Sequence, residues 1–205
     1  MALNEVTLAA MLCSRLCHDL VGPASAVLNG LELAASDPET RDEAMDMLGH
    51  SAGQVSHRLQ FFRGAYGVAS GLAFATARHL TQQMFGEAKL KVSWPAEPAG
   101  SDTRFPAGAP KIVLNMVLLA TDLLTRGGEV AVRLAPDAVR AEVAATGAAL
   151  REDLVRLLSR PGDGEVELSP RTVQPLFLQA LTAAAAARLA CHFPRPGEAL
   201  LVAEF

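Results

Sequence analysis

The sequence has few aromatic residues and no excess of positive charge. Phe, Trp and Tyr make up 5% of its 205 residues, and 22 acidic residues outnumber 18 Lys and Arg, so the net charge is −4. Proteins that bind nucleic acid need a basic face, so we expect no nucleic-acid partner. Half of the residues are hydrophobic. This composition predicts one or two small domains with a mainly helical core rich in Ala, Leu and Val.

Long hydrophobic runs are also missing. The longest apolar stretch, residues 112–124, is interrupted by Asn115, Thr121 and Asp122, and no stretch reaches the roughly eighteen apolar residues of a membrane-spanning helix. The first residues do not show the basic segment followed by an apolar one that is typical of a secretory signal. We therefore expect a cytoplasmic protein that does not contact the membrane.

Cysteine is scarce. Cys13, Cys17 and Cys191 are an odd number without a framework spacing, which argues against a disulfide scaffold. Cys17 directly precedes His18, but the Cys-x-x-x-Cys-His spacing is not that of haem attachment. Cys13 also falls on an apolar helical seam, so we interpret the cysteines as structural residues.

The residue that stands out is His18. Residues 5–35 have a helical pattern, and at 100° per residue His18 falls opposite an apolar seam, on a strip of mostly small or polar side chains. The seam consists of Ala9, Cys13, Leu16, Leu20, Ala24, Val27 and Leu31, and the strip of Met11, Ser14, Arg15, Gly22, Ser25 and Asn29. Such a strip lets another protein approach closely. A lone histidine is more often simply a solvated residue, so the neighbouring residues have to distinguish the two interpretations.

These neighbours favour a chemical role. Pro23 has no N–H, so the carbonyl of Asp19 loses its partner in the next turn, and a kink is expected that Gly22 eases. A proline inside a helix costs about 3 kcal/mol, which suggests that it is used. Asp19 can orient one ring nitrogen of His18, and Arg15 can offset the charge of a phosphoryl group on the ring.

The N-terminal part is expected to be a helical hairpin. One helix covers about residues 4–34, a turn lies at 36–39, and a second helix continues to about Tyr66. A single hairpin cannot bury the apolar faces of both helices, so we predict a homodimer that forms a four-helix bundle. The expected core positions of the second helix are Ala44, Met47, Leu48, Val55, Leu59 and Phe62.

In such a hairpin, position 18 lies level with about position 56, which brings the second helix close to His18. The candidates for contact with a partner are Ser14, Gly22, Ser25, Asn29, Gln54 and His57. For Arg15 and Asn29, ordinary solvation of a helix is an equal alternative. His50 and His57 share a helical face, but a zinc site would need ligands that the sequence does not offer, so solvated histidines are the better interpretation.

A glycine-containing segment at residues 64–71 marks a boundary, which predicts a hairpin domain of residues 1–69 and a second domain of residues 70–205. The second domain has a mixed pattern that predicts an α+β sandwich, with helices layered on an antiparallel-rich sheet. Ser169 and Pro170 are expected to start its last helix as cap and first residue. The expected elements are helices at 73–85, 111–125, 151–158 and 169–190, a strand at 89–94, a loop at 95–110, and two hairpins that pair 129–134 with 139–143 and 191–193 with 199–203.

Residues 18–23, His-Asp-Leu-Val-Gly-Pro, resemble the phosphoacceptor box of two-component histidine kinases, and the whole chain resembles their catalytic core. The residues that bind ATP in those kinases are missing, although Asn115 fits the first position of the N-box. Leu119 stands where a second Asn would hold Mg²⁺, and Ala145 stands where an acid would contact adenine. Asp122 replaces a basic residue, and residues 170–178 lack the glycines that wrap a phosphate.

This combination resembles the ChpT family of histidine phosphotransferases, most closely over residues 12–23 and 29–33. The resemblance implies a dimer with a degenerate ATPase-like domain that does not use ATP. It implies that His18 accepts a phosphoryl group from the receiver domain of a hybrid histidine kinase and passes it to response-regulator receivers, which are CtrA-like and CpdR-like in that family. No cofactor is expected on this chain, because the receiver would bring Mg²⁺. His18, Asp19 and Arg15 are the candidate catalytic residues.

Two alternatives stay open. A divergent but active histidine kinase would bind ATP saturably. A scaffold that binds receivers without carrying phosphate would keep its full function after His18→Ala. The sequence does not identify the donor kinase, the acceptors or the direction of transfer.

Overall fold

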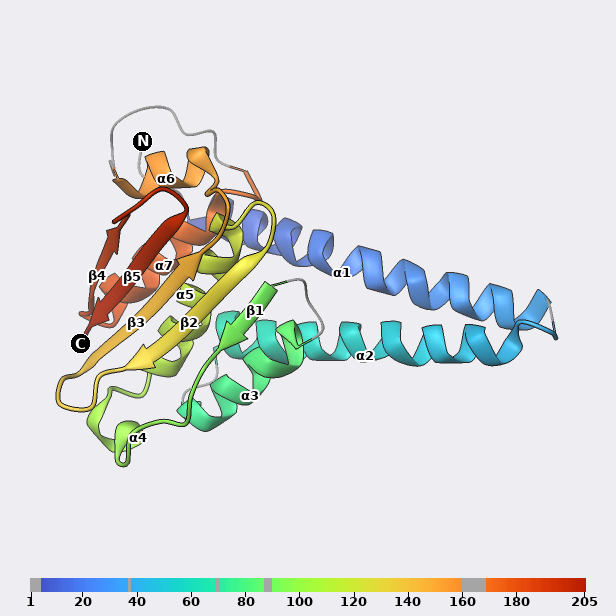
Figure 1. Cartoon of the computed structure of the whole chain (residues 1–205), viewed down its shortest axis with the longest axis horizontal. Coiled ribbons are helices and arrows are strands. Elements are labelled where there is room, and N and C mark those ends of the chain that lie inside the picture. Colours follow the sequence, from blue (N-terminus) through green and yellow to red (C-terminus); the bar gives the residue numbers. More distant parts are fainter. Residues whose placement is uncertain (1–4, 37, 69–70, 87–89, 160–168) are drawn as a thin grey trace.

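A long helical hairpin projects from an α+β body (Figure 1). The computed structural model describes residues 5–36, 38–68, 71–86, 90–159 and 169–205. The hairpin consists of α1 (Glu5–Ser36) and α2 (Arg41–Tyr66), which lie side by side along their length. Both helices agree with the sequence prediction. Asp37 in the expected turn and residues 69–70 at the expected boundary lie outside the described residues.

The body contains one five-stranded sheet in the order β1-β2-β3-β5-β4. Only the β1–β2 pair is parallel, and the other three pairs are antiparallel, as an antiparallel-rich sheet predicts. Buried and exposed residues alternate along the strands, so one face of the sheet packs on helices and the other faces solvent. The strands are β1 (Leu90–Ser93), β2 (Gly128–Leu134), β3 (Arg140–Thr146), β4 (Arg188–His192) and β5 (Glu198–Glu204).

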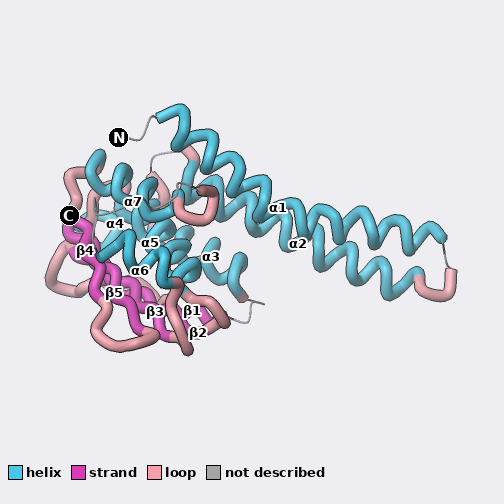
Figure 2. Tube along the Cα trace, turned by 90° about the horizontal axis from the view of Figure 1, so that it is seen from above, coloured by secondary structure: helices cyan, strands magenta, loops and turns pink. Residues whose placement is uncertain are grey.

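The helices of the body lie on the inner face of this sheet (Figure 2). The central helix is α5 (Ala109–Leu123), which packs against α2, α7 and three strands and is buried on nearly every side. A helix that is apolar all round requires this central position. The other helices are α3 (Phe74–Phe85), α4 (Ser101–Arg104), α6 (Glu152–Ser159) and α7 (Val173–Ala184). The structure therefore confirms the α+β fold class.

The prediction for the last helix was wrong at both ends. α7 begins at Val173 with Thr172 as its N-cap residue, so Ser169 and Pro170 precede the helix. It ends at Ala184, because Ala186 adopts a left-handed φ of 52° and Ala187 donates its N–H to the carbonyl of Thr182. The following residues form the edge strand β4 with β5 instead of continuing the helix. Sheet pairing thus overrides the helix propensity of the alanine run.

Two further differences concern the loop and the hairpin core. Residues 95–110 were expected to be a loop, but they contain the short helix α4 and the first residues of α5. Met47 and Leu59 were expected in the core of α2, but they are exposed, as are Ala9, Cys13, Ala24 and Leu31 of the predicted α1 seam. A single hairpin covers only part of its apolar surface, because each helix has only one neighbour along most of its length.

Candidate functional site

His18 lies on an open face of α1. Its side chain is 74% exposed, and Nδ1 lies 3.4 Å from Oδ1 of Asp19. Within the described part of the chain, Nε2 has no hydrogen-bond partner. When Nδ1 carries the proton and faces the carboxylate, the lone pair of Nε2 points toward solvent. This arrangement suits a ring that attacks an electrophile brought by another molecule.

Pro23 affects the same turn of the helix. α1 continues through Pro23 without interruption. The carbonyl of Asp19, which has lost its helical partner, accepts a hydrogen bond of 2.6 Å from Nη1 of Arg58 on α2. This contact places position 58 level with position 19, close to the alignment that the hairpin predicted.

Arg15 is not the free cation that we expected. Its side chain is nearly buried, and its two terminal nitrogens donate to the carboxylate of Asp122 on α5 at 2.6 and 2.9 Å. Its Nε lies 3.7 Å from Oδ2 of Asp19. Burial by itself lowers the pKa of Arg15, but the Asp122 carboxylate outweighs it and holds this pKa above its ordinary value. Arg15 therefore joins α1 to the α+β body instead of lying solvated on the helix surface.

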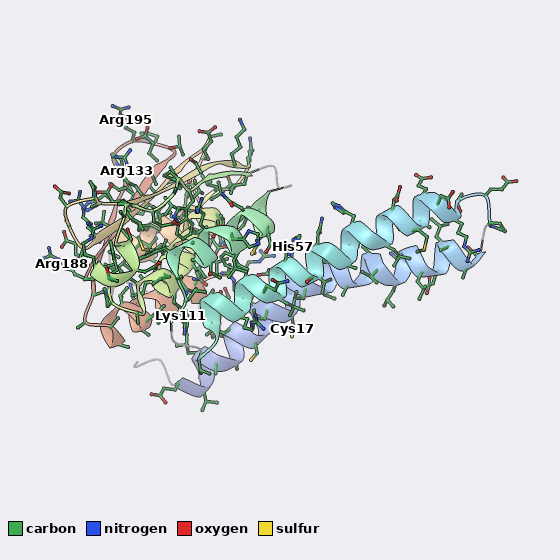
Figure 3. The ribbon with its side chains drawn as sticks, turned by 90° about the horizontal axis from the view of Figure 1, so that it is seen from below. Cys17, His57, Lys111, Arg133, Arg188 and Arg195 are labelled. Carbon is green, nitrogen blue, oxygen red and sulfur yellow. The ribbon has the colours of Figure 1, made fainter. Side chains whose placement is uncertain are left out.

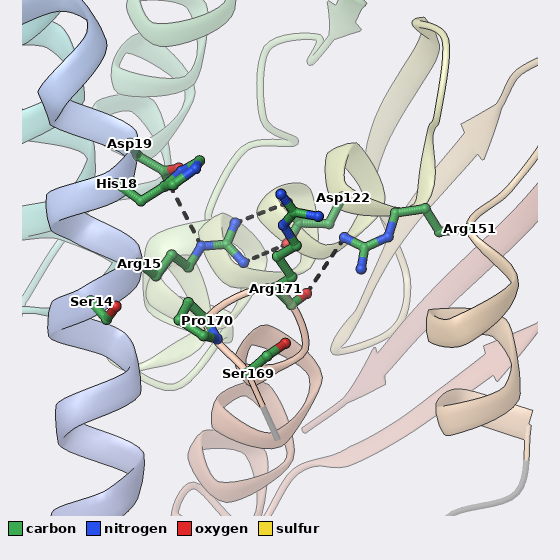
Figure 4. A pocket seen from close by; sticks show the side chains of 9 residues that line it. All are labelled: Ser14, Arg15, His18, Asp19, Asp122, Arg151, Ser169, Pro170 and Arg171. Atoms are coloured by element: carbon green, nitrogen blue, oxygen red, sulfur yellow. Dashed lines mark hydrogen bonds and ion pairs between the residues drawn. The ribbon is translucent and has the colours of Figure 1, made fainter. Parts of the chain in front are cut away.

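A cavity of about 290 Å³ lies beside His18, between α1 and the body (Figure 4). Two arginines of the body contribute to it. Arg151 pairs with Asp153 at 2.5 Å and donates to the carbonyl of Arg171 at 3.5 Å. Arg171 is exposed, and no carboxylate of the described residues pairs with it. The cavity is lined by Ser14, Arg15, His18, Asp19, Asp122, Arg151, Ser169, Pro170 and Arg171.

The structure thus brings together only some of the expected site residues. Ser14, Arg15 and Asp19 line the cavity with His18. The other candidates do not line it: Gly22, Ser25 and Asn29 are exposed along α1, Gln54 lies on α2, and Figure 3 shows His57 on the same helix. Gln54 bonds to the ring of His50 at 2.7 Å. Neither His50 nor His57 lines the cavity beside His18.

Sequence reasoning missed Arg151, Ser169 and Arg171, because more than a hundred residues separate them from His18. One signal was present. In the resemblance to histidine kinases, residues 170–178 take the place of the glycine-rich segment, and the basic residue Arg171 falls within them.

Asn115, which fits the first position of the N-box in the resemblance to histidine kinases, has a structural role. Asn115 is fully buried, and its amide donates to the carbonyls of Ala65 at 2.8 Å and Lys111 at 2.9 Å. Its Oδ1 accepts a hydrogen bond of 2.9 Å from Gln174, whose own Oε1 accepts one of 2.6 Å from Tyr66. Burial raises the pKa of Tyr66, so its hydroxyl stays a donor. These bonds tie α5 to α2 and α7.

The cysteines differ from the structural interpretation in part. Cys13 and Cys17 are exposed on α1, and Figure 3 shows Cys17 at the surface of the hairpin. Cys191 is partly buried in β4, and burial raises its pKa to about 11. Only Cys191 therefore behaves as the core thiol that was expected for all three.

Within the described ranges, no three or more His, Cys, Asp or Glu side chains are grouped so that they could bind a metal ion. The helices that the structure describes also include none with the length and apolarity needed to cross a bilayer.

Comparison with known proteins assigns the family. The family model described as the histidine phosphotransferase C-terminal domain matches residues 74–195, more than half of the chain. The chain belongs to the histidine phosphotransferase family. It is 38% identical over 136 residues to the protein phosphotransferase ChpT of Brucella abortus (strain 2308). That match covers 64% of this chain but only 63% of the Brucella protein, less than two thirds of its length.

A solved structure gives the same answer over the full chain. The present chain superposes on the structure of a bacterial phosphotransferase with a TM-score of 0.82 and 31% sequence identity, over 100% of this chain and 98% of the other. Two structures of the blue-light activated histidine kinase of Erythrobacter litoralis EL346 are more distant neighbours, with TM-scores of 0.40 and 0.38 and identities of 14% and 15%. The resemblance to the ChpT family that the first helix indicated is therefore confirmed.

Proposed function

We propose that this protein carries a phosphoryl group on Nε2 of His18, between the aspartate of one receiver domain and the aspartate of another. The observation that supports this best is the exposed imidazole, which holds Nδ1 toward Asp19 and leaves Nε2 open beside a cavity with basic residues. Nε2 attacks the phosphorus of the receiver's aspartyl phosphate, so that an N–P bond forms and the P–O bond to the aspartate breaks. The leaving group is the receiver's carboxylate, and transfer to the second receiver is the reverse reaction.

The chain's own groups would orient the ring and compensate charge. Asp19 holds the proton on Nδ1 and stabilises the positive charge that the ring gains when Nε2 bonds to phosphorus. Arg171 is our candidate for neutralising the phosphoryl oxygens, because its side chain lines the cavity without a carboxylate partner among the described residues. Arg15 was the earlier candidate, but Asp122 already engages its guanidinium.

We also propose that the protein does not use ATP. Leu119 is fully buried where an Asn of a histidine kinase would hold Mg²⁺, and Leu has no oxygen for a hard cation. The amide of Asn115 is engaged by backbone carbonyls and by Gln174. Ala145 is buried in β3 and offers no acid for adenine. Mg²⁺ would then come with the receiver, so that this chain needs no cofactor.

The exposed apolar face of the hairpin supports the proposal of a homodimer. Six large side chains of α1 and α2 are at least half exposed: Val6, Val21, Leu28, Leu31, Met45 and Leu59. Exposed apolar residues along two long helices favour a partner of the same kind, and a second hairpin would cover them in a four-helix bundle. The same two-fold arrangement would present two copies of His18.

The partners and the location follow from the family and remain proposals. We propose a receiver domain of a hybrid histidine kinase as the donor, and CtrA-like and CpdR-like receivers as acceptors, in the cytoplasm. The net charge of −4 supports an absence of nucleic-acid partners.

The test follows a radiolabelled phosphoryl group. A receiver domain labelled on its aspartate is mixed with wild type, His18→Gln, or the control His192→Gln on the exposed edge strand β4. We expect acid-labile, base-stable label on the wild type and on the control, and none on His18→Gln. Label at another residue, or none on the wild type, contradicts the proposal.

Two further measurements separate the alternatives. A calorimetric titration with ATP is expected to show no saturable binding, whereas saturation would indicate an active kinase. A downstream assay with His18→Ala is expected to show loss of signalling, whereas full function would indicate a scaffold.

A further inference from the structure

The carbonyl that Pro23 leaves without a helical partner is bonded across the hairpin. In an ordinary helix the carbonyl of Asp19 would accept the N–H of residue 23, but proline has none. Nη1 of Arg58, in the C-terminal half of α2, supplies the missing donor at 2.6 Å. A charged donor to a backbone carbonyl makes a stronger hydrogen bond than an amide does.

This bond acts on the residue that orients the reacting ring. The carboxylate of Asp19 lies 3.4 Å from Nδ1 of His18 and 3.7 Å from Nε of Arg15, while its carbonyl is held by Arg58. The backbone of Asp19 is therefore fixed to α2 and its side chain to the site. In a helix without the proline, the carbonyl of Asp19 would accept its hydrogen bond from within α1, and the hydrogen bond from α2 to this turn would be lost.

We infer that Arg58 is a positioning residue for phosphotransfer, and that it works as a unit with Pro23. The proline frees the carbonyl of Asp19, and Arg58 uses that carbonyl to hold the His18 turn at one orientation relative to α2. The inference rests on the proposed function, because it assigns Arg58 a part in the reaction at His18.

The unit predicts a specific coupling. In the wild type, Arg58→Ala leaves the carbonyl of Asp19 without a donor, and the turn that carries His18 loosens. In a Pro23→Ala background, the N–H of residue 23 donates to the carbonyl of Asp19. Arg58→Ala should then have little effect on the turn that carries His18. A purely structural arginine would give equal effects in both backgrounds.

The experiment measures single-turnover transfer from a phosphorylated receiver domain at several receiver concentrations. We expect Arg58→Ala to lower the maximal rate about 10-fold without changing the half-saturating receiver concentration, since misplacement of a reacting group acts on the chemical step. Arg58→Lys keeps a charged donor and is expected to recover most of the rate. In the Pro23→Ala background, Arg58→Ala should lower the rate less than about 2-fold. Arg63→Ala, an exposed arginine on the same helix, is the matched control.

A second readout does not depend on transfer. The ¹⁵N chemical shifts of the His18 ring report which nitrogen carries the proton, and we expect the Nδ1–H form in the wild type and a more mixed population in Arg58→Ala. Circular dichroism shows whether each variant is folded.

The outcomes separate the two proposals. A wild type that takes no label refutes the proposed function, and with it the part of Arg58 in the reaction. A labelled wild type with unchanged rate and unchanged ring shifts in Arg58→Ala overturns the inference alone. The inference is also overturned if Arg58→Ala lowers the rate equally in the wild type and in the Pro23→Ala background. It is likewise overturned if Arg58→Ala changes only the half-saturating receiver concentration.

Discussion

The ion pair between Arg15 and Asp122 is expected to hold the hairpin against the α+β body. It joins residues 107 positions apart through two short hydrogen bonds, and it leaves Arg15 only 8% exposed. Asp122→Ala removes the carboxylate and leaves a charged guanidinium covered by protein. Breaking a fully buried pair in this way costs about 3–5 kcal/mol of unfolding free energy, and the partial exposure of Asp122 places our expectation near the lower end, at about 3 kcal/mol.

The assay is urea unfolding followed by circular dichroism, with every variant at one protein concentration because dimerisation would shift the apparent stability. Asp122→Asn keeps an acceptor and is expected to lose less than Asp122→Ala. The double variant Arg15→Met/Asp122→Leu replaces both charges by apolar groups of similar size, and we expect it to be more stable than Asp122→Ala.

The same unfolding measurements on the single and double variants of Arg15 and Asp122 also give the result that would refute this reasoning. A loss below about 1 kcal/mol for Asp122→Ala would mean that the pair is solvated like an ordinary surface salt bridge. A double variant that loses as much as the two single substitutions added together would mean that the two side chains do not act as a pair.

Three more predictions concern the cavity, the hairpin surface and the buried thiol. Arg171→Ala should slow labelling of His18 at least 10-fold, since it removes the cation beside the phosphoryl group, while Arg133→Ala on the open face of the sheet should leave the rate unchanged. Leu28→Asp/Leu31→Asp should yield monomers in sedimentation equilibrium, and a dimer of wild-type affinity would contradict the proposed bundle. Burial raises the pKa of Cys191 to about 11, so its native thiol should react with iodoacetamide at pH 8 more slowly than in urea. The unfolded chain ionises first, so the stability that Cys191 contributes should fall as the pH rises from about 9 to about 11 relative to Cys191→Ser; equal alkylation rates in native and denatured protein would contradict this.

Local patterns were sufficient for much of the fold. The apolar period of 3.6 residues predicted α1 and α2, and alternation predicted β2 and β3, because each of these elements presents an apolar face whose spacing follows from its own backbone geometry. The alanine run after Thr182 was different. Its helix propensity favours a continued α7, but the edge of the sheet offers β4 a partner that local propensity cannot anticipate.

The site divides in the same way. His18, Asp19 and Pro23 are neighbours in one helix, so their chemistry could be inferred from spacing alone. Arg171 and Arg58 could not be assigned, because what each arginine faces depends on which elements pack together. Arg15 shows the limit most clearly: one turn from His18 it was expected to be a free cation, and only the packing of the α+β body against the hairpin gives it Asp122 as a partner.

The sequence by itself determined that an exposed histidine would lie in a proline-containing helix, and it predicted that residues typical of a histidine-kinase nucleotide site are replaced, because both inferences depend on residue identity and short spacing. Only the tertiary structure decided which charges surround that histidine. Contacts between groups 39 to 107 positions apart arise only when separate elements pack: Arg58 meets Asp19 when α1 and α2 pair, and Arg15 meets Asp122 when the body packs against the hairpin. The direction in which a long side chain points is set by that packing and not by its neighbours in the chain.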